Sequence, residues 1–331
     1  MRERFLAGLL DRLGFLRALE AVPGRPRLVA LNYHRIGHDR DSPYDPGLWS
    51  ADPESFAAQV RYLKRHFDLV LPEQLDDVAR QRRGRFAMIT FDDGYRDNHD
   101  VAFPILRAEN ASATFFVATG YIDAPRVPWW DEVSWMLHRS PRSQLDLRPF
   151  VADPVDISPP KREHTLRSLL RVYKALPQER TDDYLAAIAD ATGSGRHPPQ
   201  GAESFWMNWD MLRAMSGAGM TIGGHTVNHP VLARMDKISQ QQEIKICVDR
   251  LKTELGRPVR SFSYPVGAAN CFNQDTRDCL REVGVDFAFT YYGGYSRPSG
   301  WDRYDIPRVA IEPYIDASWF RAIAQFPEVF A

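Results

Sequence analysis

The chain has few cysteines, no long apolar run and almost no net charge, and each shortage excludes a class of protein. Its three cysteines lack CxxC spacing, and an odd number cannot pair completely within the chain, so we expect a reducing compartment rather than a disulfide scaffold. No apolar stretch has the length needed to span a bilayer. A formal net charge of -1 gives no basic field for nucleic acid. What remains is a globular chain of 331 residues, enough for one large domain or two small ones.

The first 26 residues begin basic and then turn apolar, as a secretory signal does. Asp11 and Arg12 interrupt the apolar stretch and no small-residue cleavage site follows, so we do not predict a signal peptide. Apolar residues recur instead at helical spacing, at Phe5, Leu6, Leu9, Leu10, Leu13, Leu16 and Leu19. This pattern predicts an amphipathic helix over 1–26, which either packs on its own domain or contacts a membrane surface or a partner. We therefore expect a cytoplasmic protein, peripheral to the inner membrane in the second case.

Short apolar runs alternate with helical patterns along the rest of the chain. The runs that we interpret as buried strands are 27–34, 86–93, 112–119, 220–225, 261–265 and 286–292. The helical patterns are 56–66, 102–109, 209–218, 239–255 and 274–283, several of which begin near Asp, Ser or Asn. The alternation predicts an α/β fold with a mainly parallel sheet and outer helices, either open or closed into a barrel. Functional groups should then gather at the carboxyl ends of the strands.

One stretch interrupts this alternation. From about 130 to 205 there is little strand signal, but two segments have helical periodicity and a proline-rich segment lies around 149–160. We interpret it as a helical insertion in a domain that covers 27–331. No motif inside it has a catalytic signature of its own.

The chemistry begins with adjacent carboxylates at the end of a predicted strand. Successive side chains of a strand point to opposite sides, so Asp92 and Asp93 can serve one site only if the chain turns there. Gly94 permits that turn. Taken alone, the doublet is equally well explained as turn chemistry, because Asp and Gly favour loops.

A second motif changes this balance. His225 and His229 lie four residues apart directly after another predicted strand, and two imidazoles at this spacing can bind one ion. Two histidines and one carboxylate form a common catalytic zinc set with a position left open. Either aspartate could be the ligand, and the other would then be free to act as a base.

A third element follows a later strand, where Pro265 and Gly267 bend the chain. Such a bend can direct a backbone N–H at a developing oxyanion. An ordinary loop is the alternative.

These motifs together resemble a known family. The sequences TFDDGY at 90–95, HTVNHP at 225–230 and SYPVG at 263–267 are similar, in this order, to the first three motifs of the polysaccharide deacetylases, also called the NodB homology domain or carbohydrate esterase family 4. The resemblance extends over about 27–313. It implies a distorted (β/α) barrel and metal-dependent removal of N-acetyl groups from amino sugars. By position, Asp92 resembles the general base, and Asp93, His225 and His229 resemble the ligands of a divalent ion, usually Zn²⁺, with Co²⁺, Ni²⁺ or Mn²⁺ as alternatives.

The chain departs from this family in two places. Ser263 stands where the third motif commonly has an arginine that contacts the catalytic carboxylate. Arg308 lies in DIPRVAI at 305–311, which we interpret as the last strand, and could supply that guanidinium instead. The late Leu-x-His motif, which carries the general acid, is absent because no histidine follows His229. His34 ends the first predicted strand, which neighbours the last strand in a closed barrel, so it can take the same place. This resembles circularly permuted members of the family; His38 is a weaker candidate.

The resemblance implies a complete scheme for hydrolysis of an acetamide. The ion polarises the acetyl carbonyl and activates water, Asp92 takes the proton, a backbone N–H near Val266 helps to hold the oxyanion, and His34 protonates the leaving amine. For substrate contacts we expect Trp130, Asp131, Tyr264, Pro265 and Val266, because a sugar ring packs its apolar face on aromatic side chains. We expect an N-acetylated glycan or a lipid-linked precursor in exopolysaccharide synthesis. The alternatives are a metal-dependent amidase acting on a non-sugar amide and a non-catalytic glycan-binding protein.

Overall fold

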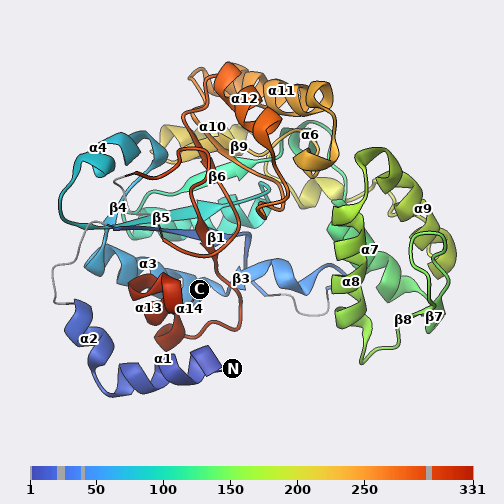
Figure 1. Cartoon of the computed structure of the whole chain (residues 1–331), viewed down its shortest axis with the longest axis horizontal. Helices are drawn as coiled ribbons and strands as arrows, with labels where there is room; N and C mark the ends of the chain where they lie inside the picture. The colour runs from blue at the N-terminus through green and yellow to red at the C-terminus, as the bar shows by residue number, and fades with distance from the viewer. Residues whose placement is uncertain (1, 21–26, 39–41, 296–299, 331) are drawn as a thin grey trace.

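The computed structural model describes residues 2–20, 27–38, 42–295 and 300–330. Its centre is a parallel sheet with the strand order β11–β10–β9–β6–β5–β1–β12, and β4 pairs with β5 beside this path (Figure 1). The strands are β1 (Arg27–Tyr33), β4 (Asp68–Leu69), β5 (Arg85–Phe91), β6 (Thr114–Val117), β9 (Thr221–Gly224), β10 (Ser261–Ser263), β11 (Phe287–Phe289) and β12 (Arg308–Ala310). All the strands predicted from sequence are present, each shorter by one or more residues.

The sheet curves until its two ends nearly meet. On one side of β12, Arg308 lies opposite Ala30 of β1. Two residues before β12, Ile306 forms a parallel bridge with Phe289 of β11. The first and last strands are therefore neighbours in a nearly closed (β/α) barrel, which confirms the predicted fold class.

The interior of the barrel is apolar at one end and polar at the other. The apolar part consists of alternate strand residues together with two residues of α4 (Leu75–Arg80): Leu28, Ala30, Phe86, Met88, Phe116, Phe287, Phe289, Leu75 and Val78. Continuing the same alternation toward the carboxyl ends gives Asn32 on β1 and Thr90 and Asp92 on and after β5. The two-residue period of the strands therefore carries Asp92 onto the inward face, above a sealed apolar plug.

Helices cover the outside of the barrel (Figure 1). Those predicted from sequence are α3 (Pro53–His66), α5 (Phe103–Ala108), α10 (Trp209–Gly217), α11 (Lys237–Leu255) and α12 (Gln274–Glu282). Asp52, Asn208, Asp236 and Asn273 each accept a hydrogen bond from a backbone N–H in the first turn, which explains where four of these helices begin. Other elements are α6 (Thr119–Asp123), α13 (Ala317–Gln325), α14 (Pro327–Phe330), β2 (Arg35–Ile36), β3 (Trp49–Ala51), the π-helical turn η3 (Asn98–Ala102) and the 3-10 turns η1 (Pro46–Leu48), η2 (Pro72–Gln74), η4 (Gln178–Arg180), η5 (Ala202–Ser204) and η6 (Leu232–Arg234).

The N-terminal segment forms two helices where the sequence predicted one. They are α1 (Arg2–Arg12) and α2 (Phe15–Glu20), separated at Gly14, whose φ of 73° a helix cannot contain. Both helices pack against α13, and Ala7 of α1 and Leu16 of α2 are fully buried. Large apolar side chains nevertheless stay exposed on these helices, namely Phe5, Leu6, Leu9, Leu13 and Phe15. No helix in the described part of the chain has the length and hydropathy to cross a membrane.

A helical lobe lies to one side of the barrel (Figure 1). It contains α7 (Trp129–Arg139), α8 (Arg162–Ala175) and α9 (Thr181–Thr192), in the region predicted as an insertion. It also contains an antiparallel pair, β7 (Gln144–Leu145) and β8 (Val155–Asp156), that the sequence did not predict. Strands of two residues are too short to show an alternating pattern, so no signal for them exists.

Asp131 of α7 fastens this lobe to the barrel. Its Oδ1 accepts a hydrogen bond from the backbone N–H of Asp45 at 2.8 Å, and its Oδ2 accepts one from the hydroxyl of Tyr95 at 2.9 Å. We predicted Asp131 as a substrate contact, but its side chain is fully buried and engaged in these bonds. Burial raises the pKa of Asp131 to about 7, although the nearby Arg35 guanidinium acts in the opposite direction.

This raised pKa predicts a specific dependence of stability on pH. Because the folded chain holds the Asp131 proton more tightly than the unfolded chain does, this group favours folding most below about pH 4, and its contribution falls as pH rises to about 7. We expect Asp131→Asn to remove this dependence, which amounts to at most about 1.4 kcal/mol per pH unit. The free energy of unfolding should be measured by denaturant titration between pH 4.5 and 8 with a chelator present. A constant difference between the two proteins across that range would contradict the prediction.

Candidate active site

Both aspartates of the doublet reach the same end of the barrel because the backbone turns between them. The N–H of Asp92 still bonds the carbonyl of Tyr33, as in a continued strand, but Asp93 has a φ of 75°. We attributed this turn to Gly94 alone; the structure places it at Asp93 as well, with a φ of 95° at Gly94. A non-glycine residue in this region costs about 1–3 kcal/mol, which is typical of a functional position.

Asp93 lies between the two predicted histidines. Its Oδ1 is 3.4 Å from Nε2 of His225 and 3.5 Å from Nε2 of His229, and all three side chains are buried. The donor atoms of the three residues lie within 4.8 Å of one another. The sequence left open which aspartate joins the histidines, and this geometry selects Asp93.

The hydrogen bonds of these side chains suit a divalent cation. Nδ1 of His225 donates to the carbonyl of Ser263 at 2.7 Å, so Nε2 is the ring nitrogen that faces Asp93. Oδ1 of Asp93 is buried without a hydrogen-bond partner, a costly state for a carboxylate unless something else satisfies it. Burial and the neighbouring His225 lower the pKa of His229 to about 3, so its imidazole is neutral and able to act as a ligand near pH 7. Two imidazoles and one carboxylate therefore fit the zinc set that the resemblance implies.

The loop that carries the histidines is held in a strained conformation. Thr226 has a φ of 67° and His229 a φ of 56°. From α11, Glu243 accepts hydrogen bonds from the backbone N–H groups of Val227 and Asn228, each at 2.8 Å. Sequence reasoning missed Glu243, because a glutamate on an amphipathic helix gives no sign that it caps a loop 15 residues earlier.

Asp92 is paired with Arg308 inside the barrel. Nη1 of Arg308 donates to Oδ1 of Asp92 at 2.8 Å and Nη2 donates to Oδ2 at 2.7 Å, a bidentate geometry. The hydroxyl of Ser263 also donates to Oδ2 at 3.2 Å. Burial alone would raise the pKa of Asp92, but the Arg308 charge overrides it and holds this pKa far below its ordinary value. Asp92 is therefore an ionised, rigidly oriented carboxylate.

His34 follows β1 and lies on the wall of the same cavity. Its backbone is fixed from two sides, since Ser50 accepts from its N–H at 3.0 Å and Asn98 donates to its carbonyl at 2.7 Å. Its ring packs edge-on against Tyr291, with centroids 5.6 Å apart. Burial raises the pKa of the adjacent Glu312, whereas the His34 charge lowers it. By contrast, His38 is exposed and does not line the cavity.

The site opens into a cavity of about 840 Å³ between the barrel and the helical lobe. Of the predicted substrate contacts, Trp130, Tyr264 and Val266 line it, whereas Asp131 and Pro265 do not. Val266 has a φ of 62°, and its N–H bonds no acceptor in the described part of the chain. The cavity is also lined by residues that sequence reasoning missed, namely Asp45, Glu163, Arg167, Lys174 and Glu312. They come from distant segments, so no local motif joins them.

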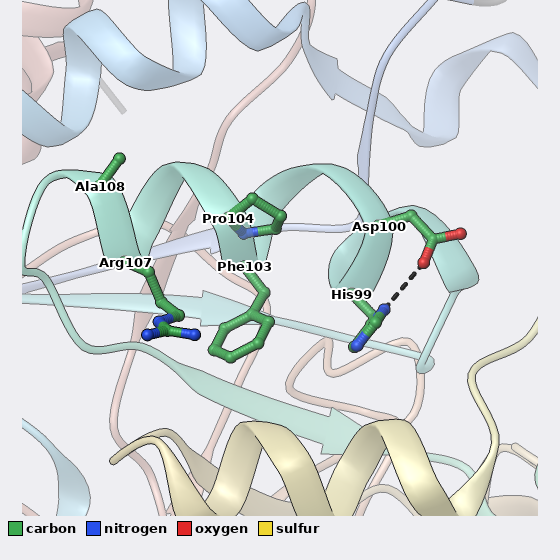
Figure 2. Close-up of a pocket in the computed structure, with 6 residues that line it drawn as sticks. All are labelled: His99, Asp100, Phe103, Pro104, Arg107 and Ala108. Carbon is green, nitrogen blue, oxygen red and sulfur yellow. Dashed lines mark hydrogen bonds and ion pairs between the residues drawn. The ribbon is translucent and has the colours of Figure 1, made fainter.

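A second hollow, of about 700 Å³, lies over η3 and α5 (Figure 2). His99, Asp100, Phe103, Pro104, Arg107 and Ala108 line it. Nδ1 of His99 lies 2.8 Å from a carboxylate oxygen of Asp100, so the two most reactive groups satisfy each other. None of the predicted site residues lines this hollow.

Comparisons with known proteins agree with the geometry. The family model described as polysaccharide deacetylase matches residues 79–143 and 172–288. Among solved structures, the chain is similar to the Streptococcus pyogenes deacetylase PplD in complex with acetate, with a TM-score of 0.58, 18% identity, and 88% of this chain and 96% of that chain covered. It is also similar to IcaB from Ammonifex degensii, with a TM-score of 0.57, 19% identity, and 92% and 98% covered. For the BpsB deacetylase domain from Bordetella bronchiseptica, the TM-score is 0.55, the identity 19%, and the coverage 88% and 97%.

At these identities the structural likeness shows the fold alone. No curated protein matches the sequence. The matched segments of the family model, however, make up more than half of the chain and include Asp92, Asp93, His225, His229 and the SYPVG motif. The chain therefore belongs to the polysaccharide deacetylase family and is a hydrolase of the N-deacetylase type.

Proposed function

We propose that the protein is a metal-dependent N-deacetylase of an amino-sugar glycan or of its precursor in exopolysaccharide synthesis. The observation that carries this proposal is the pair of carboxylates at the base of one cavity. Asp93 faces two imidazoles, and Asp92 is held ionised by Arg308. Adjacent residues thus have different environments, as a ligand and a base require.

The environment of Asp92 supports metal dependence. A carboxylate whose pKa is held this low is a weak base and cannot remove a proton from ordinary water. A divalent ion held by Asp93, His225 and His229 would supply a Lewis acid for the acetyl carbonyl and lower the pKa of the attacking water. We propose Zn²⁺, with Co²⁺, Ni²⁺ or Mn²⁺ as alternatives, because the donor set is nitrogen and oxygen.

The remaining steps are assigned to three groups of the chain. Asp92 accepts the proton of the attacking water, and Arg308 and Ser263 keep its carboxylate oriented. Val266 lines the cavity, and its backbone N–H donates to the developing oxyanion. His34 donates a proton to the nitrogen of the leaving amine. Trp130 and Tyr264 offer aromatic surface to the sugar ring, in keeping with their place on the wall.

The division of labour between ligand and base predicts two different mutant phenotypes. Asp92→Asn should bind metal in a stoichiometric amount and lose about 10²–10⁴-fold in turnover, because only the base is removed. His225→Ala should lose both metal and turnover. Acetate release from chito-oligosaccharides and metal content after dialysis measure the two properties, with the exposed Asp100→Asn as control. Because Asp92→Asn leaves the buried charge of Arg308 without a counter-charge, thermal unfolding should be measured to check that this variant is still folded. Normal hydrolysis by either variant would contradict the assignment of Asp92 as the base or of His225 as a metal ligand.

The role of His34 predicts that its loss depends on the leaving group. His34→Gln should slow hydrolysis of an N-acetyl sugar by about 10²–10⁴-fold, and should slow an anilide, whose amine leaves more easily, much less. Kinetics on both substrates measure this difference, and His38→Gln serves as the matched control. Near-wild-type rates of His34→Gln on the unactivated acetamide would remove His34 from the scheme.

We further propose that α1 and α2 hold the protein on the cytoplasmic face of the inner membrane, where lipid-linked sugar precursors would meet the site. Phe5 is 75% exposed and Leu13 72% exposed, which is unusual for side chains of this size. Ala7 and Leu16 already anchor the same helices to the barrel, so the exposed residues are free for another surface. All three cysteines are free and buried, which suits a reducing compartment.

This proposal predicts that charge on the exposed face abolishes membrane binding. Phe5→Glu combined with Leu13→Glu should weaken binding to phosphatidylglycerol-containing vesicles by at least about tenfold, because two large side chains no longer leave water. Co-sedimentation measures the affinity. The matched control is Ile238→Glu with Ile246→Glu, two exposed apolar residues of α11. Equal binding by both double variants would contradict the proposal.

The two alternative functions predict other results. An amidase for non-sugar amides would hydrolyse simple acetamides as fast as acetylated sugars. A non-catalytic glycan-binding protein would need neither the metal nor Asp92.

A further inference from the structure

One face of α8 contributes a row of side chains to the wall of the cavity. Glu163, Arg167, Leu170 and Lys174 all line it, at the spacing of four, three and four residues that places side chains on one side of a helix. The helical lobe therefore does more than cover the barrel. It presents two cations to whatever enters the cavity.

The first of these cations is fixed by the barrel's own N-terminal region. Nη1 and Nη2 of Arg167 donate to the two carboxylate oxygens of Asp45, at 2.8 and 2.6 Å. A Cβ atom at Gly47 would lie 2.3 Å from Nη2 of Arg167, so a larger residue there would displace the guanidinium from this position. Asp45 is itself held by Asp131. Arg167 is thus rigidly placed, and its charge is balanced.

The second cation, Lys174, has no such balance. In the described part of the chain its ammonium group forms an ion pair with no carboxylate, and Nζ lies 5.9 Å from the centroid of the Trp129 ring. Burial lowers the pKa of Lys174, and Asp45, whose charge opposes this shift, is already bonded to Arg167. A largely buried ammonium without a counter-charge is destabilising unless a ligand supplies that charge.

The ring of Trp129 lies between this ammonium group and His229, one of the residues that would hold the metal. Trp129 stacks on Tyr173 of α8 and lies 6.5 Å, between centroids, from the ring of His229. Trp129 and Trp130 meet edge to face, and Trp130 in turn packs 4.5 Å from His229. The rings of Trp129 and Trp130 therefore form an aromatic wall between Lys174 and His229.

The other acids of the cavity are already accounted for. Arg308 neutralises Asp92, Arg167 neutralises Asp45, and Asp93 faces the imidazoles. Glu312 lies by Tyr291 and His34, and Glu163 is exposed; in the described part of the chain neither forms an ion pair with Lys174. A neutral glycan would leave Lys174 uncompensated.

We propose that Lys174, beside Arg167 and Trp129, binds an oxyanion on the acetylated sugar, so that the natural substrate is an anionic N-acetyl sugar rather than a neutral polymer. This proposal rests on the proposed function, since it places a charged group next to the acetamide that the site hydrolyses. Two sources share this chemistry. One is a phosphate on the anomeric position, as in a nucleotide- or lipid-linked sugar, and the other is the carboxylate of a neighbouring uronic acid.

Binding and turnover together test the proposal. Calorimetric titration should compare three ligands, N-acetylglucosamine 1-phosphate, a disaccharide of glucuronic acid and N-acetylglucosamine, and neutral di-N-acetylchitobiose. Wild-type protein should bind at least one charged ligand about tenfold more tightly than the neutral one, the factor that a charge-assisted hydrogen bond supplies. The charged ligand that binds more tightly than the neutral one identifies the source of the oxyanion.

The variants isolate the charge of Lys174. Lys174→Met should abolish the preference without weakening binding of the neutral ligand, and Lys174→Arg should retain it. Arg171→Met is the matched control, because Arg171 is an exposed cation of the same helix outside the cavity. No preference in the wild type, or an unchanged preference in Lys174→Met, would overturn the proposal.

Acetate release, measured in parallel on the same ligands, separates this inference from the proposed function. Binding preference without any release would refute the deacetylase proposal and leave the oxyanion site standing. Acetate release from neutral and charged sugars alike, with no binding preference, would support the deacetylase proposal and refute the oxyanion site.

Discussion

The buried guanidinium of Arg308 is the constraint around which the barrel is organised. Its side chain has no exposed surface, so every N–H must find an acceptor inside the protein. The acceptors come from around the ring: Asn32 of β1, Thr90 of β5, Asp92 after it, Ser263 of β10 and the carbonyl of Thr290 after β11. Backbone hydrogen bonds of Ala288, Thr290 and Ile306 join β11 to the segment before β12, and Nε of Arg308 adds a side-chain bond to the carbonyl of Thr290. The same guanidinium therefore links the strands at the closing seam and keeps Asp92 ionised.

From that pair follows the contrast between the two aspartates. They are adjacent in the chain, but the inward face of β5 gives one to a guanidinium, and a left-handed turn gives the other to two imidazoles. Opposite environments for neighbouring carboxylates are the usual way in which one site obtains two functions from one residue type. The two cations of the cavity wall also differ in their environments, because Asp45 neutralises the charge of Arg167 and no carboxylate in the described chain pairs with Lys174.

Sequence patterns predicted what depends on local order. Short apolar runs located the strands, and the polar residues after them located the candidate site, because parallel strands share one carboxyl edge. Arg308 was found because Ser263 occupies the place where an arginine was expected. The break of the N-terminal helix was missed, since its apolar periodicity continues through Gly14. The roles of Glu243, Lys174 and Arg167 depend on contacts between distant segments. The Arg167–Asp45 contact spans 122 residues, and single-sequence periodicity contains no information about such pairs.

Of the non-glycine residues with positive φ in the described chain, all but Asn110 belong to the site loops: Asp93, Thr226, His229 and Val266. At these positions the side chain and the backbone shape are separate requirements. An alanine there removes a functional group and keeps the strain, whereas a glycine removes the group and relaxes the loop. The difference between the two substitutions measures how much of the site's order is stored in the main chain. The site is thus as much a property of four torsion angles as of the side chains attached to them.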